Sequence, residues 1–174
     1  MQLRLKISQL GLLLAVSLIL SYIESVLPFN FGIPGMKLGL PNLAIVLTLY
    51  LFGWQEALLI NISRIILSGF MFGNLAGILF SLAGALVSFV CMLAAKRCRI
   101  FSAGAVSIVG GVMHNTGQLL IAVLIVKTVG ILYYLPILLI AGMITGGLIG
   151  IVAMKTIPYL RKLVCDTGKE TDYE

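Results

Sequence analysis

The pattern of apolar and polar positions divides the 174-residue chain into six apolar segments. A helix that crosses a bilayer needs about 20 mainly apolar residues. Charges, prolines and glycines bound the segments, and the pattern predicts helices over residues 5–27, 41–52, 55–68, 75–95, 102–126 and 132–157. The second is only about 12 residues and roughly 18 Å long, so we expect a short or broken helix that leans on its neighbours. The predicted fold is an all-α, polytopic membrane bundle of six transmembrane helices.

Two expectations concern the ends of the chain. Residues 1–160 form a single six-helix domain, and residues 161–174 form a polar cytoplasmic tail that frays. The apolar run over residues 10–27 follows basic residues, as in a signal peptide, but it lacks a small-residue cleavage site and further spans follow it. We expect it to be retained as the first helix.

Composition agrees with a membrane protein. Hydrophobic residues make up 60% of the chain, charged residues 10%, and the mean hydropathy is +1.14. A soluble domain carries about 25% charged residues, so a soluble enzyme domain, a disordered chain and a nucleic-acid binder are excluded. The three cysteines lack metal-ligand spacing, and we expect unpaired thiols without chemistry.

The Lys and Arg residues predict the orientation. With six spans, both termini and the second-to-third and fourth-to-fifth loops share one side. Only Lys37 and Lys127 lie on the opposite side, and Arg64 lies within a span. The positive-inside rule then places both termini in the cytoplasm and the protein in the plasma membrane. The basic residues on the shared side number nine: Arg4, Lys6, Lys96, Arg97, Arg99, Lys155, Arg161, Lys162 and Lys169.

Polar residues within the spans mark a candidate binding site, because ionisable groups at membrane depth usually face a cavity or a partner. Asn61, Arg64 and Ser68 share one face of the third helix, and His114 and Gln118 share one face of the fifth. The orientation places these groups, together with Glu24 near the outer end of the first helix, in the outer half of the bundle. The predicted substrate-binding residues are Glu24, Lys37, Asn42, Arg64, Ser68, His114, Asn115 and Gln118.

Each of these residues also has a structural interpretation. Arg64 would form an internal ion pair with Glu24, and His114 would be a neutral core histidine satisfied by Asn115 or a backbone carbonyl. Asn42 and Asn74 would be helix caps.

Joint placement on one side of the membrane favours a pocket. Arg64 and His114 on its wall would suit a carboxylate or phosphate. The Gly- and Pro-rich loop around Pro34 and Gly35 would act as a lid.

Motifs for catalysis are missing from the sequence. No aspartate precedes Asp166, so the chain has no aspartate-rich motif for a magnesium diphosphate. It also has no phosphate-binding P-loop, no metal-spaced histidine cluster and no Ser/His/Asp set. We therefore expect no enzyme activity, no cofactor and no metal.

Small residues recur at four-residue spacing, which lets helices approach closely in lipid. In the first helix these are Gly11 with Ala15, and Ser17 with Ser21 and Ser25. They would either pack within the bundle or dock another membrane subunit. For the ridge of Gly142, Gly146 and Gly150 in the sixth helix we expect internal packing.

Several strings resemble those of a known family. They are Glu24-Ser-Val-Leu-Pro, Ile33-Pro-Gly-Met-Lys-Leu-Gly-Leu-Pro-Asn42, Tyr50-Leu-Phe-Gly-Trp-Gln-Glu-Ala57, Arg64, Ser81-Leu-Ala-Gly84, His114-Asn-Thr-Gly-Gln118 and Tyr133-Tyr-Leu-Pro136. Over about residues 10–155 the chain resembles the Gx transporter family, also labelled heptaprenyl diphosphate synthase component I. Pro41 departs from the family, which more often has Ala before the Asn.

That family is in turn similar to the substrate-binding S components of energy-coupling-factor (ECF) transporters. The resemblance implies a vitamin- or precursor-class solute captured outside and released inside. It implies docking through Gly11 and Ala15 onto a membrane scaffold subunit that carries two ATPase subunits. Two alternatives stay open: a non-catalytic membrane subunit of isoprenoid or quinone synthesis that binds a prenyl diphosphate or a soluble synthase, and a homodimeric exporter.

Overall fold

The structure is a computed structural model that describes residues 2–27 and 39–169. Within these residues, five helices are long and apolar enough to cross a membrane, and a sixth is short. The predicted all-α bundle with a short second helix is confirmed. In order, the elements of the described chain are α1 (Gln2–Val26), α2 (Asn42–Leu51), α3 (Trp54–Phe72), α4 (Leu75–Arg97), α5 (Ala103–Val126), the 3-10 helix η1 (Val129–Tyr134) and α6 (Leu135–Lys169).

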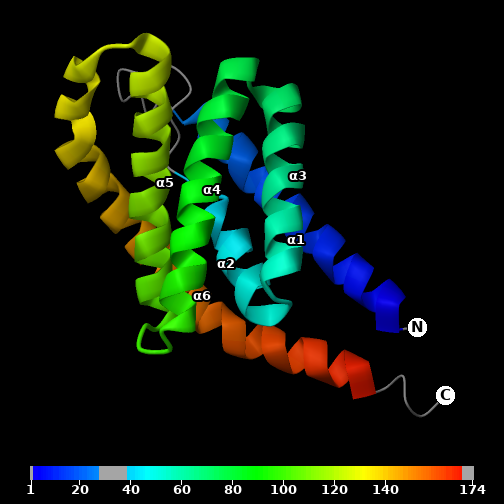
Figure 1. The fold of residues 1–174 in the computed structure, drawn as a ribbon. Coiled ribbons are helices and arrows are strands. Elements are labelled where there is room, and N and C mark those ends of the chain that lie inside the picture. Colours follow the sequence, from blue (N-terminus) through cyan, green and yellow to red (C-terminus); the bar gives the residue numbers. More distant parts are fainter. Residues whose placement is uncertain (1, 28–38, 170–174) are drawn as a thin grey trace.

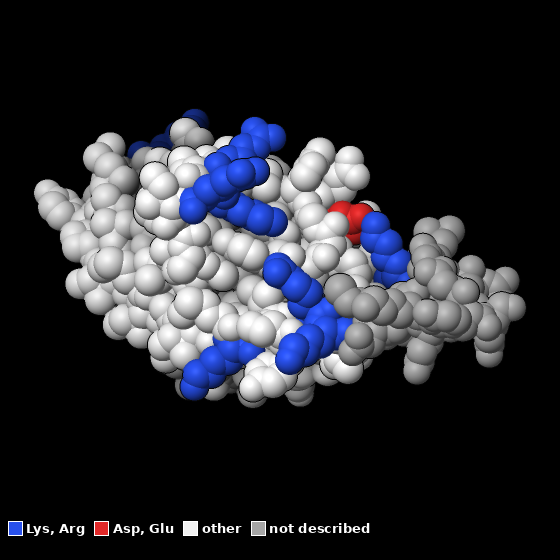
Figure 2. Space-filling model, turned by 90° about the horizontal axis from the view of Figure 1, so that it is seen from below, with Lys and Arg blue, Asp and Glu red and all other residues white. Residues whose placement is uncertain are grey.

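The helices run between two ends of the bundle (Figure 1). The N-terminus, the α2–α3 turn, the α4–α5 loop and the C-terminal part of α6 lie at the lower end, and the α3–α4 and α5–η1 connections lie at the upper end. We call the lower end the basic end, because Figure 2 shows many Lys and Arg side chains on it. This grouping of loops and termini is the one that the sequence pattern predicts.

Helix α2 forms the centre of the bundle. It contacts α1, α3, α5 and α6, and its residues from Ala44 to Leu49 are all buried. A helix of ten residues is about 15 Å long, which is too short for a bilayer. Because protein surrounds it, its backbone ends are shielded from lipid, where unpaired polar groups are costly.

Two basic side chains fix helices at the basic end. Lys6 on α1 pairs with Glu56 on α3 at 2.5 Å. Lys96 on α4 donates from Nζ to the carbonyl oxygen of Leu49 at 2.6 Å and lies 4.7 Å from the centre of the Tyr50 ring. A cation near the C-terminus of a helix stabilises it, so Lys96 secures the last turn of α2.

Helices α5 and α6 pack backbone against backbone along a glycine ridge. A Cβ atom on Gly146 would lie 2.7 Å from the carbonyl oxygen of Ser107, and one on Gly142 would lie 2.8 Å from that of Gly111. Gly150 meets Gly104 in the same way, and Ser107 Oγ donates to the Gly146 carbonyl at 2.8 Å. The predicted internal packing of this ridge is confirmed.

The small residues of α1 separate into two groups. Ser17 and Ser21 are buried, and each donates its hydroxyl to a carbonyl of its own helix. Gly11 and Ala15 are exposed, and nothing lies within 4 Å of a Cβ atom built on Gly11. Ser17 and Ser21 therefore pack inside, whereas Gly11 and Ala15 face outward.

Two predicted helix ends are wrong. We expected the third helix to end at residue 68, but α3 continues through Gly69, which lies directly against Ile78 of α4, to Phe72. We expected the sixth helix to end at residue 157 and the chain to fray from Arg161, but α6 continues through Pro158 to Lys169. Proline removes one backbone hydrogen bond and can bend a helix without ending it. Before α6, residues 129–134 form η1 instead of the first turn of a regular helix.

The glycine ridge predicts a selective effect of one methyl group. Gly146→Ala places a Cβ against the backbone of α5, whereas a Cβ on Gly147 meets nothing within 4 Å. We expect Gly146→Ala to lower the free energy of unfolding by about 1–3 kcal/mol, measured by loss of helical circular dichroism in detergent. Gly147→Ala is the matched control and should be neutral or slightly stabilising, because alanine favours helix over glycine. Equal effects at the two positions would contradict the tight α5–α6 contact.

Candidate functional site

Polar side chains from four helices converge inside the bundle. Glu24 lies in the last turn of α1, Asn42 in the first turn of α2, and Arg64 and His114 near the middles of α3 and α5. All are at least nine-tenths buried. We call the set the buried polar cluster: Glu24, Asn42, Asn61, Arg64, His114 and Gln118.

The guanidinium of Arg64 is held by its own helix. Its Nε and Nη2 atoms donate to Asn61 Oδ1 at 3.3 and 3.1 Å. Glu24 acts electrostatically on this charge, but the ion pairs found between described residues do not include a direct Glu24–Arg64 contact. The ion pair between Arg64 and Glu24 that the sequence suggested is therefore not a direct contact. Arg64 is hydrogen-bonded to Asn61 and is attracted by Glu24 at longer range. The predicted common face of Asn61, Arg64 and Ser68 is confirmed by the burial of all three.

Gly39 joins α1, α2 and α5 at the cluster. Its backbone N–H donates to Glu24 Oε1 at 2.5 Å. A Cβ atom on it would lie 2.9 Å from Asn42 Nδ2 and 3.4 Å from His114 Cδ2. Its φ of +88° is one that side-chain-bearing residues rarely adopt. Gly39 therefore lets the chain before α2 pass between the carboxylate and the imidazole.

His114 lies against both its own helix and α4. Its Nε2 is 3.2 Å from Gln118 Nε2, one turn further along α5. A Cβ atom on Gly84 of α4 would lie 2.7 Å from the His114 carbonyl oxygen and 2.9 Å from Gln118 Cγ. The predicted common face of His114 and Gln118 is confirmed. The side chain next to the imidazole is Gln118, not Asn115 as one interpretation of the sequence suggested.

Two buried amides have an atom without a hydrogen-bond partner among the described residues. Asn42 is 4% exposed and its Nδ2 finds no acceptor; Asn115 is 1% exposed and its Oδ1 finds no donor, although its Nδ2 donates to the Leu138 carbonyl at 2.9 Å. The expected capping role of Asn42 is wrong, because Pro41 occupies the N-cap of α2 and Asn42 lies inside the helix. Burying an unpaired amide costs about 1–3 kcal/mol, so these atoms are suited to a polar partner.

The other predicted residues divide into three groups. Asn74 caps α4, with its Oδ1 accepting from the Gly77 N–H at 2.7 Å, which confirms its capping role. Ser68 is buried but donates only within its own helix, to the Ile65 carbonyl. Lys37 and the proposed lid around Pro34 and Gly35 lie outside the described residues.

Three participants were absent from the predicted site. The sequence placed Asn61 on the same helix face as Arg64, but its role as hydrogen-bond acceptor for the guanidinium depends on side-chain rotamers. Gly39 and Gly84 act through close approach, which residue type alone does not reveal. A glycine two residues before Pro41 was the available signal for Gly39.

The buried polar cluster combines charged groups with hydrogen-bonding groups. Arg64 supplies a cation, Glu24 a carboxylate, and the amides of Asn42 and Gln118 can donate or accept. Such groups orient a polar molecule in an apolar surrounding. Among the described residues, no group of three or more His, Cys, Asp or Glu could hold a metal ion.

Sequence comparison identifies the family. The family model described as heptaprenyl diphosphate synthase component I matches residues 13–156. The chain belongs to this family. It has no match among curated proteins or solved structures. The matched region extends from α1 into α6 and includes every residue of the buried polar cluster.

The electrostatic link between Glu24 and Arg64 can be tested by a double-mutant cycle. We expect Glu24→Gln and Arg64→Gln each to lower the free energy of unfolding by about 3 kcal/mol, because each removes a charge that attracts the other inside the bundle. The double variant should lose less than the sum by more than about 0.5 kcal/mol. Chemical unfolding in detergent, followed by helical circular dichroism, measures all four proteins. Simple additivity would show that the two charges do not interact.

Proposed function

We propose that this protein is the substrate-binding component of an ECF-type uptake transporter and that it binds a small polar solute at the buried polar cluster. The observation that carries the proposal is the burial of a cation, a carboxylate and several amides, drawn from four helices, inside a mainly apolar bundle. Polar groups at membrane depth are expensive and usually serve a pathway or a ligand.

The cluster favours a solute with an acidic group and a hydrogen-bonding group. Arg64 would bind a carboxylate or phosphate by charge-assisted hydrogen bonds. Glu24 would accept from a hydroxyl or an amine, and the unsatisfied Nδ2 of Asn42 would donate to an oxygen of the solute. His114 and Gln118 would complete the wall, since Gly39 brings His114 next to Asn42.

The protein itself would not be an enzyme. Its cluster holds one carboxylate and one imidazole, and the sequence lacks an aspartate-rich diphosphate motif. Transport would therefore require energy supplied by another subunit. We propose a membrane scaffold subunit with two ATPase subunits, which would dock on the outward-facing ridge of Gly11 and Ala15 on α1.

Orientation follows from charge. The basic end would face the cytoplasm, by the positive-inside rule. The solute would then be captured from the opposite side of the plasma membrane, towards which Glu24 lies in the last turn of α1.

A second candidate function is supported by the family description, which names a component of a prenyl diphosphate synthase. In that role the protein would be a membrane subunit that holds a prenyl diphosphate or a soluble synthase. One structural feature favours it: an apolar groove of about 330 Å³ lined by Leu18, Ile19 and Tyr22 of α1 and by Phe72 of α3. A prenyl chain would suit such a groove, whereas a water-soluble solute would not.

The experiment that separates these functions is mass spectrometry of small molecules released from the gently purified protein. We expect a polar, acidic metabolite in the wild-type protein. We expect Arg64→Gln to reduce its amount per protein by tenfold or more, because charge-assisted hydrogen bonds contribute about 1.5–3 kcal/mol.

Arg97→Gln is the matched control, because it removes the same charge from an exposed position at the basic end. It should retain the metabolite. A folded Arg64→Gln protein that keeps its solute would remove the centre of the proposal. A released prenyl diphosphate would favour the second function.

A further inference from the structure

A continuous exposed stripe along α6 changes from apolar to cationic. Ile144, Leu148 and Ile151 are each at least half exposed, and they are followed at the same spacing by Lys155, Tyr159 and Lys162, which are also exposed. Steps of three or four residues keep all six side chains on one face of a helix. The stripe therefore has an apolar part followed by a cationic part, which complements the acyl chains and the anionic headgroup of a lipid.

The point on α6 where the stripe changes from apolar to cationic side chains lies at the level expected for the edge of a membrane. Met154, next to Lys155, packs against Gly104, where a Cβ atom would lie 2.8 Å from Met154 Cε. Gly104 is in the first turn of α5, just after its N-cap Ser102. Lys155 thus lies at the level where α5 begins at the basic end, and Tyr159 and Lys162 lie beyond it. Tyr and Lys are favoured at the boundary between acyl chains and headgroups.

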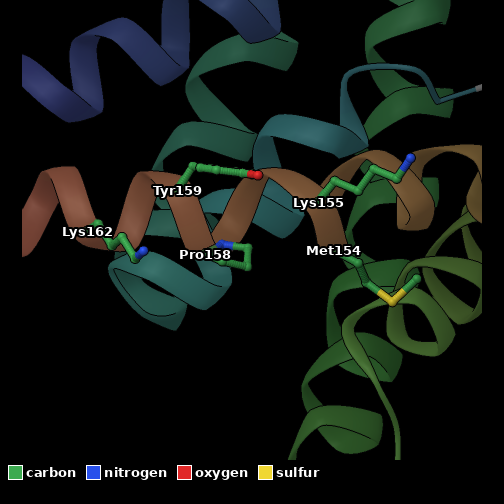
Figure 3. Close-up of a pocket in the computed structure, with 5 residues that line it drawn as sticks. All are labelled: Met154, Lys155, Pro158, Tyr159 and Lys162. Atoms are coloured by element: carbon green, nitrogen blue, oxygen red, sulfur yellow. The ribbon is translucent and has the colours of Figure 1, made fainter.

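A groove occupies the cationic part of the stripe. It has a volume of about 620 Å³ and is lined by Met154, Lys155, Pro158, Tyr159 and Lys162. Figure 3 shows that all five lining residues come from α6, with Lys155 and Lys162 on opposite sides of Pro158 and Tyr159. Because proline has no N–H, the helix offers no backbone donor from Pro158 to the Met154 carbonyl four residues earlier. The groove combines two ammonium groups and a phenol as donors.

We propose that this groove binds the phosphate headgroup of an anionic phospholipid, whose acyl chains lie along Ile144, Leu148 and Ile151. The ammonium groups of Lys155 and Lys162 lie at the two ends of the groove (Figure 3) and would attract the phosphate from either side, and the Tyr159 hydroxyl would donate to a phosphate oxygen. Basic pockets at the cytoplasmic ends of membrane helices have this recognition chemistry. The proposal does not depend on the solute or on the proposed transport function.

Native mass spectrometry of the full-length protein titrated with lipid tests the proposal. The probes are dioleoyl phosphatidylglycerol and, for comparison, dioleoyl phosphatidylcholine. We expect the wild type to bind one phosphatidylglycerol in preference to phosphatidylcholine. The double variant Lys155→Gln/Lys162→Gln should weaken that binding roughly thirtyfold, from the loss of two surface cations.

The double variant Arg97→Gln/Arg99→Gln is the matched control, because both arginines are exposed at the same end and lie outside the groove. It should keep phosphatidylglycerol binding within about twofold. An equal loss in both double variants, or no preference over phosphatidylcholine, would overturn the proposal. Displacement of the lipid by millimolar inorganic diphosphate would overturn it as well, because the groove would then recognise a free anion. All variants change exposed residues, and their helical circular dichroism should match the wild type.

Discussion

A bilayer offers a protein no hydrogen-bond partners, and the rest of this structure depends on that constraint. It requires helical backbone in the spans and directs apolar side chains outward, as Ile144, Leu148 and Ile151 show on α6. It also makes an unpaired polar atom inside the bundle costly, so the unpaired amide atoms of Asn42 and Asn115 are exceptions among the described residues. The central place of α2 follows from it, because a ten-residue helix is stable at this depth only when other helices surround it.

Close packing without a hydrophobic driving force needs small residues. The α5–α6 contact meets this need with glycines on both helices, so that the backbone of Gly146 lies against that of Ser107. Close approach has a second consequence at the buried polar cluster. Gly39 and Gly84 bring backbone next to His114 from two sides, which places the imidazole near Asn42 and Gln118. The same property of glycine therefore serves both stability and the site.

The charges of the protein have two different roles. Arg64 and Glu24 lie deep in the bundle, where charge is costly and has to be compensated. The basic residues at the basic end either hold helices together or are exposed. Lys96 secures α2 through the Leu49 carbonyl, whereas Lys155 and Lys162 line an open groove. The two sets of charges therefore differ in burial: Arg64 and Glu24 are enclosed by the bundle, whereas Lys155 and Lys162 are exposed.

The sequence by itself determined the helical bundle, its short second helix and the grouping of loops at two ends. These features follow from the hydropathy and charge of each segment, which depend little on the helices that pack against it. Helical spacing also predicted the shared faces of Asn61 with Arg64 and of His114 with Gln118. Only the tertiary structure decided which side chains pair: Arg64 contacts Asn61 and is attracted by Glu24 without a direct contact, and Asn42 is a buried amide instead of a cap. It also decided that Ser17 and Ser21 face inward while Gly11 and Ala15 face outward, and that α6 continues past Pro158. Such outcomes depend on rotamers, on close contacts between distant segments and on which face of a helix the neighbours cover, and a local pattern contains none of these.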